Sequence, residues 1–130
     1  MLGGCRVVVL ATAMADGRPH LVPVVFAQDG QDLVTAIDAK PKTGRRLTRL
    51  VNIGRDPRVC LLGHHYEEDW TRLWWVRVDG SATLEGAGEQ FERAIRSLRE
   101  RYRQYEVTRL EGPVIRIAIE RVTGWRAVPR

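Results

Sequence analysis

Hydrophobic residues along the chain follow two periods, which predict two kinds of secondary structure. Residues 73–85 alternate as a half-buried strand does, with Trp74 and Val76 on one face and Trp75 and Arg77 on the other. Residues 88–105 follow the helical period instead. The apolar stripe of this predicted helix consists of Phe91, Ile95, Leu98, Tyr102 and Tyr105.

The remaining elements are shorter. A valine-rich run over residues 6–13 predicts a strand buried on both faces. Further strands are predicted at residues 20–27, 33–37, 58–63, 114–119 and, as a last short strand, 122–126. A second helix is predicted at residues 43–52, with Thr43 as its N-cap. Asp16-Gly17 and Asp29-Gly30 are hairpin signals. Six or seven strands joined by hairpins, with two inserted helices, predict a mainly β fold: one antiparallel barrel domain over residues 1–130.

Composition narrows the class of protein. The apolar fraction of 44% and the charged fraction of 28% are typical of soluble globular domains. No apolar run approaches the ~20 residues that cross a bilayer, and the first residues lack the pattern of a signal peptide. Cys5 and Cys60 lie in apolar surroundings without metal-ligand spacing, so we interpret them as small buried hydrophobic residues. These features predict a cytoplasmic protein without membrane association.

One short segment concentrates cationic side chains. The chain carries a net charge of +5, and its only two lysines, Lys40 and Lys42, flank Pro41 directly before the predicted helix. Arg45 and Arg46 follow within the first helical turn. Ammonium and guanidinium groups beside free amide donors at a helix start suit an anion such as phosphate. The alternative is a solvated charge run beside a helix start.

Several catalytic chemistries lack their motifs. No glycine fingerprint for a dinucleotide or a P-loop is present, and neither Ser81 nor Ser97 lies in a nucleophile motif. His64 and His65 point to opposite faces of an extended chain, which favours a solvated loop over a metal site. His20, at the start of the second predicted strand, could donate a hydrogen bond to a ligand. Alternatively, its side chain could cap the preceding turn.

Trp74 and Trp75 are adjacent, so their side chains leave an extended strand on opposite faces. One interpretation places one indole in the barrel and the other over a sheet edge. The interpretation that we favour places the outward indole against a second subunit or a flat ligand.

Four blocks of sequence carry a family resemblance: Leu10-Ala11-Thr12 with residues 16–24, residues 37–43, residues 47–59, and residues 66–80. In this order they resemble the split-barrel flavin and deazaflavin proteins related to pyridoxamine 5′-phosphate oxidase. Within that family, they are most similar to the branch of coenzyme F420-dependent enzymes.

The resemblance implies a homodimer with two cofactor sites between the subunits. The residues that it implies near the cofactor ring are His20, Val22, Pro23, Thr35 and Ala36. The residues that it implies at the phosphate are Lys40, Lys42, Thr43, Arg45 and Arg46, and Trp74 or Trp75 would come from the partner subunit. The implied reaction is hydride transfer between F420 and a small organic substrate near His20 and residues 64–72. Since the cofactor supplies that chemistry, no acid–base pair is required.

Three alternatives share these observations. The same cationic turn could hold the phosphate of FMN in an oxidoreductase of the same fold. The protein could also bind a cofactor without turnover. A barrel that binds single-stranded nucleic acid would carry cations spread along a strand face. Here the lysines cluster in one turn, so we expect no nucleic-acid partner.

Overall fold

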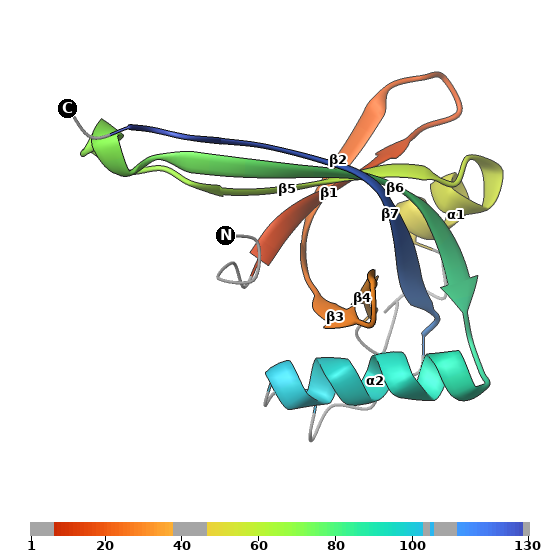
Figure 1. Ribbon diagram of the computed structural model, residues 1–130. Helices are drawn as coiled ribbons and strands as arrows, with labels where there is room; N and C mark the ends of the chain where they lie inside the picture. Colours follow the sequence, from red (N-terminus) through yellow and green to blue (C-terminus); the bar gives the residue numbers. More distant parts are fainter. Residues whose placement is uncertain (1–6, 38–46, 103–104, 106–111, 129–130) are drawn as a thin grey trace.

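The computed structural model describes residues 7–37, 47–102, 105 and 112–128. Seven antiparallel strands form one sheet in the order β2-β1-β5-β6-β7-β4-β3. Figure 1 shows this sheet curling into a half-barrel, with a long flat arm on one side and helix α2 below its open end. The predicted mainly β barrel with two helices is confirmed.

The bounds of the elements follow. The strands are β1 Val7–Ala13, β2 Pro19–Val25, β3 Ala27–Asp29, β4 Asp32–Thr35, β5 Arg58–His65, β6 Trp74–Glu85 and β7 Val114–Arg126. The helices are α1 Thr48–Arg55, α2 Glu89–Arg101 and the short 3-10 helix η2 Trp70–Arg72.

Two apolar clusters hold the fold together. The first fills the half-barrel and includes Leu10, Leu61 and Ile115, each at most 1% exposed. The second packs α2 against the barrel through Leu98 and Val114. The predicted helical stripe lies in this second cluster: Ile95, Leu98, Tyr102 and Tyr105 are buried and Phe91 packs against them.

The second predicted strand is divided in two. β2 ends at Val25 and β3 begins at Ala27, so Phe26 lies between them outside both ladders. The Tyr102 hydroxyl accepts from the Phe26 N–H at 3.3 Å and donates to the Phe26 carbonyl at 2.8 Å. A side chain 76 residues away thus satisfies the backbone of the corner, which a local pattern could not predict.

The last two predicted strands form one continuous strand, β7. It pairs with β6 over the full length of that strand, and its register shifts between Asp79 and Gly80. A Cβ atom built on Gly80 would lie 2.5 Å from the Ala118 carbonyl oxygen and 2.8 Å from Ile117 Cγ2. Glycine therefore permits a close backbone approach at a bulge where the ladder bends out of the barrel.

The prediction that residues 6–13 are buried on both faces is wrong. In β1, Val8, Leu10 and Thr12 are buried, whereas Val7 is exposed and Val9 is half-buried. The outer face of this strand is uncovered because no helix or second sheet packs on it among the described residues.

A buried ion cluster closes the end of the barrel above α2. Arg116 is 6% exposed, and its guanidinium donates to Glu85 at 2.5 Å, Asp29 at 2.8 Å and Asp32 at 3.2 Å. It also donates to the Gln90 carbonyl at 2.9 Å. Burial works against the charge, but the carboxylates raise the pKa of Arg116 above its ordinary value. Burial likewise opposes ionisation of Asp29, yet the Arg116 guanidinium holds the pKa of Asp29 below its ordinary value.

Gly80→Ala should lower the free energy of unfolding by about 1–3 kcal/mol, because its methyl group has no room beside the Ala118 carbonyl. Urea denaturation measures the change. Gly54→Ala is the matched control, because that Cβ meets no atom within 4 Å in α1 and alanine favours the helix. Equal stability of Gly80→Ala and the wild type would contradict the close approach.

Arg116→Met should lower the free energy of unfolding at pH 7 by about 3–5 kcal/mol, because it leaves buried carboxylates without their cation. Asp29 has a lowered pKa in the folded protein, so its stabilisation is present above pH ~4 and is lost as the pH falls through the folded value. The difference in stability between wild type and variant should therefore narrow from pH 7 to about pH 3. A difference that stays constant over this range would refute the ion cluster as its source.

Candidate functional site

The start of helix α1 differs from the prediction. The helix begins at Thr48, and Leu47 occupies the N-cap position with extended backbone and no side-chain cap. The prediction that Thr43 caps this helix is wrong, because the apolar Leu47 side chain packs against the barrel core and sets the first turn there. Thr43 itself lies outside the described residues, as do Lys40, Lys42, Arg45 and Arg46.

A cavity of about 440 Å³ lies at the point where that cationic segment leaves and rejoins the described fold. Ile37 and Leu47, the residues on either side of the segment, both line it. Pro23 and Ala36 contribute from β2 and from the residue after β4. The resemblance implies that these two residues lie near the cofactor ring; both line this cavity, and that a cofactor binds there stays a prediction.

Arg49 is a cavity residue that sequence reasoning missed. It is half-buried, lies in the first turn of α1 and lines the cavity beside Leu47. Its position two residues after the helix anchor was the available signal, since a first-turn side chain lies close to the entry of the chain. The described wall thus combines apolar side chains with one guanidinium group, which suits the ring and the anionic part of one ligand.

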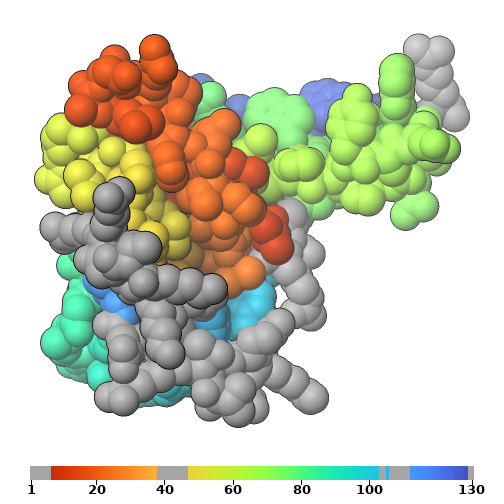
Figure 2. Space-filling view, turned by 180° about the vertical axis from the view of Figure 1, so that it is seen from behind, coloured from red at the N-terminus to blue at the C-terminus, as the bar shows by residue number. Residues whose placement is uncertain are grey.

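Helix α1 is fixed beside β1 by polar contacts. The Asn52 side-chain amide donates to the buried Thr12 hydroxyl at 3.0 Å. The Arg55 guanidinium donates to the Ala13 carbonyl and lies 3.4 Å from the Asn52 side-chain oxygen. Figure 2 shows α1 directly beside the hairpin of β1 and β2. These contacts hold the C-terminal half of the helix against β1, while Leu47 and Leu50 pack its first turn against the barrel core.

The other β-strand residues predicted at the cofactor ring have structural contacts. The Thr35 hydroxyl donates to the Val25 carbonyl at 2.7 Å and so links β4 to β2. Val22 is half-buried and packs against the barrel core. Their side chains therefore support the cavity wall rather than line it.

His20 lies elsewhere on β2. It stands opposite the buried Thr12 in the β1–β2 ladder, and its Nδ1 atom is buried without a hydrogen-bond partner among the described residues. His20 and Pro23 are three positions apart along the strand, which is about 10 Å. His20 does not line the cavity beside α1.

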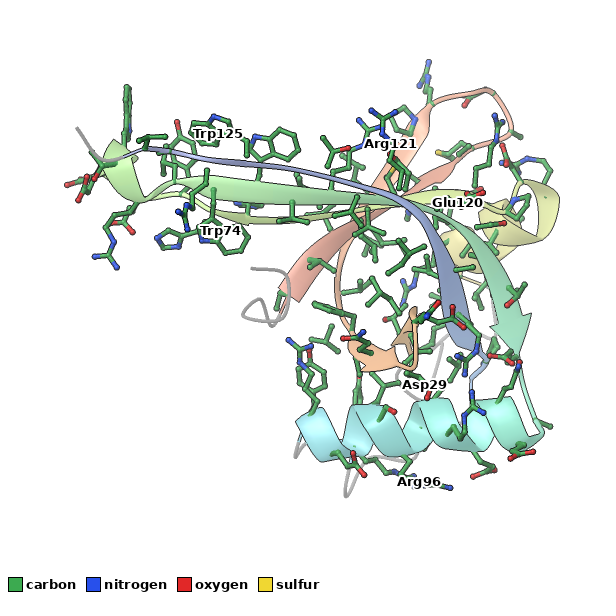
Figure 3. All side chains as sticks on the ribbon, in the orientation of Figure 1. Asp29, Trp74, Arg96, Glu120, Arg121 and Trp125 are labelled. Atoms are coloured by element: carbon green, nitrogen blue, oxygen red, sulfur yellow. The ribbon has the colours of Figure 1, made fainter. Side chains whose placement is uncertain are left out.

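Trp74 and Trp75 lie on the arm, defined here as residues 62–65 of β5, residues 74–78 of β6 and residues 122–126 of β7, with η2 at its tip. On one face, Trp74 stacks on His65 with ring centroids 6.4 Å apart. On the other, Trp75 stands opposite Trp125. Figure 3 shows Trp74 and Trp125 on opposite sides of the arm. The indoles leave on opposite faces as predicted, and neither lines the cavity beside α1.

The prediction that Cys60 is a buried hydrophobic residue is wrong. Cys60 is half-buried on the outer face of the sheet, and its thiol donates to Asp79 at 2.8 Å. Burial and the Asp79 carboxylate raise the pKa of Cys60, so the thiol is a poor nucleophile at neutral pH. Within the described part of the chain, no three His, Cys, Asp or Glu side chains form a metal-binding group.

Comparison with known proteins identifies the family. The family model described as pyridoxamine 5′-phosphate oxidase matches residues 1–126. No curated protein is significantly similar in sequence.

Among the described helices, none combines the length and the apolar character needed to span a membrane.

Several solved structures share the fold. A conserved hypothetical protein of Mycobacterium tuberculosis, Rv2991, is 25% identical with a TM-score of 0.77, covering 96% of this chain and 79% of its own. An FAD-binding protein of Mesorhizobium loti is 23% identical with a TM-score of 0.67, over 95% of this chain and 85% of its own. The heme storage protein HutZ of Vibrio cholerae is 17% identical with a TM-score of 0.72, and the match covers 95% of this chain and 87% of HutZ.

Proposed function

Because the chain belongs to the pyridoxamine 5′-phosphate oxidase family, we propose that it is an oxidoreductase that binds coenzyme F420 in the cavity beside α1. One observation carries this proposal: the segment that holds both lysines begins and ends at the wall of that cavity. Lys40 and Lys42, with Thr43 and Arg45 or Arg46, are proposed to hold the phosphate. Pro23 and Ala36 bound the apolar part of the same cavity.

The proposed reaction is hydride transfer between the deazaflavin and a small organic substrate. The cofactor supplies the hydride chemistry, and the protein binds it, orients it and excludes water. Arg49 adds a half-buried positive charge at the cavity wall, which favours an anionic ligand. The apolar side chains of Ile37 and Leu47 exclude water from the same wall.

A flavin is the alternative occupant. FMN also carries a phosphate on a flat ring system, and a structural neighbour is an FAD-binding protein. A cofactor-binding protein without turnover is a further alternative, since another neighbour is a heme storage protein. Separate fluorescence titrations with F420 and FMN show which of the two cofactors is preferred. Tighter binding of F420 supports our proposal, and a preference for FMN supports the flavin enzyme.

Lys42→Ala should weaken binding of F420 by about 1–3 kcal/mol, roughly 5- to 150-fold in Kd, because a charge-assisted contact to phosphate is lost. Fluorescence titration measures the change. Arg96→Ala is the control, because it removes the same charge from the solvent face of α2, where Figure 3 shows Arg96 pointing away from the barrel. An unchanged affinity in Lys42→Ala would remove this lysine from the site.

We further propose that a second copy of the chain covers the outer face of the arm. That face carries Leu62, Trp75 and Trp125, and it continues onto the small side chains Ala11 and Cys60 of the barrel wall. Leu62 and Trp125 are 38% and 47% exposed, which is a large apolar surface for three strands. A homodimer would bury this surface and would bring aromatic residues of one subunit to the other.

Trp125→Glu should weaken the dimer by about 2 kcal/mol or more, roughly 30-fold in Kd, because a central aromatic residue at an interface carries much of its energy. Sedimentation velocity measures the dissociation. Val51→Glu places the same charge at a residue of α1 that is also 47% exposed, and it should leave the dimer intact. A wild-type protein that is monomeric at micromolar concentration would overturn the proposed dimer.

A further inference from the structure

One edge of the sheet is unpaired where β7 runs out along the arm. Strand β4 pairs with β7 only over residues 115–118, so residues 119–126 pair with β6 on one side and, among the described residues, with no strand on the other. The two outermost strands are protected, since β2 carries Pro19 and Pro23 and β3 is three residues long and contacts α2. Residues 119–126 contain no proline, and Val122 is 61% exposed.

One hydrogen bond fixes which backbone groups face this edge. The Ala127 N–H donates to the Leu73 carbonyl at 2.9 Å, so Ala127 directs its backbone groups toward β6. Because these groups alternate in direction along an antiparallel strand, those of Val122, Gly124 and Arg126 point away from β6. Three successive donor–acceptor sites therefore face outward, at the spacing that an added strand requires.

The sequence of this edge is complementary to itself. When two copies pair antiparallel about Thr123, Val122 lies opposite Gly124 of the second copy, and these two residues exchange both backbone hydrogen bonds. The two-fold axis generates the same pair again. Arg121 lies opposite Trp125 of the second copy, where a guanidinium group over an indole is favourable. Thr123 lies opposite Thr123 of the second copy, and paired threonines are also favourable in a sheet.

Arg121 and Trp125 lie on the same face of β7. Both stand opposite outer-face residues of β6, and Figure 3 shows them on the same side of the sheet. Asp79, the carboxylate opposite Arg121, already accepts from the Arg77 guanidinium at 3.0 Å and from the Cys60 thiol at 2.8 Å. The Arg121 guanidinium can therefore turn toward an indole of another copy. A register shifted by two residues in either direction keeps the outward backbone groups paired but loses this contact.

We propose that residues 121–125 of β7 pair with the same residues of a second copy, so that the three strands of the arm continue into a six-stranded sheet. The two-fold axis of this contact runs perpendicular to the sheet, whereas the dimer proposed above joins two outer faces. One contact uses the edge of β7 and the other uses its face. The two contacts are therefore compatible, and together they join four copies in a closed assembly.

Disulfide cross-linking tests the register, in a background of Cys5→Ser and Cys60→Ser that removes both native thiols. Oxidation of Thr123→Cys should give a covalent dimer, because opposed residues of a non-hydrogen-bonded pair lie within reach of a disulfide. Arg77→Cys is the matched control, since it lies on the same face one strand further from the edge. Its distance to the same position of the second copy is about 14 Å, so it should not cross-link. No cross-link in Thr123→Cys, or an equal one in Arg77→Cys, would overturn the proposal.

Val122→Pro tests the backbone hydrogen bonds, because it removes an N–H that points away from β6 and takes no donor from the β6–β7 ladder. Val122→Ala keeps this N–H and is the control. In sedimentation velocity, Val122→Pro should weaken association at least 10-fold relative to Val122→Ala, while its circular dichroism matches that of the wild type. Equal association of the two variants would contradict the edge contact. Failure of the outer-face dimer alone would leave the Thr123→Cys cross-link in place, so the two proposals fail separately.

Discussion

The ladder between β6 and β7 is the constraint on which the rest of the molecule depends. Its two strands are 12 and 13 residues long and remain paired throughout, with one register shift at Gly80. On one side of that shift the ladder is a wall of the barrel, with Ile115 and Ile117 in the core. On the other side its inner face still adds Val78 and Val76 to that core before the ladder runs on as the arm. A close backbone approach at one glycine lets the same two strands serve both parts.

The barrel half of the ladder and the arm differ in the interactions that their side chains make. The barrel half is stabilised by apolar burial and by the Arg116 ion cluster, and α1 is fixed to β1 at its side. The barrel half also carries the cavity beside α1, whose wall includes Ile37 and Leu47. The arm shares Val76 and Val78 with the barrel core, and it carries Trp70, Trp74, Trp75 and Trp125, the four tryptophans of the chain. Aromatic residues concentrated outside a core are typical of surfaces that contact partners or ligands.

Periodicity predicted most of the fold because its causes are local. The alternation in β6 and the helical stripe of α2 follow directly from which residues must face a core. The errors arose where distant residues decide the local structure. Tyr102 divides the second predicted strand at Phe26, and Leu47 sets the start of α1 by packing on the barrel. The Arg116 cluster could not be predicted, because Asp29 and Asp32 lie 87 and 84 residues away in sequence.

For the candidate site, the structure places some of the residues that the resemblance implied at one cavity and others elsewhere, and the binding site itself stays a prediction. The resemblance implied Pro23 and Ala36 near the cofactor ring, and both line the cavity whose wall includes Ile37 and Leu47. The resemblance also implied His20 near the ring, but His20 stands opposite Thr12 in the β1–β2 ladder and does not line this cavity. Arg49 was missed because the helix was predicted to start at Thr43, so the first-turn position of Arg49, which was the available signal, could not be recognised. Trp74 and Trp75 can reach a cavity beside α1 only from another subunit, which is why the dimer is part of the proposal.

Hydrogen–deuterium exchange with and without F420 tests the central claim most directly, because it reports where the cofactor binds without any substitution. We predict slower exchange in residues 22–25, 36–37 and 47–50 when F420 is bound, since described residues of these segments line the cavity beside α1, and in the lysine segment between them, which is proposed to hold the phosphate. Protection confined to the arm, or exchange that is unchanged at a saturating concentration of F420, would contradict the account.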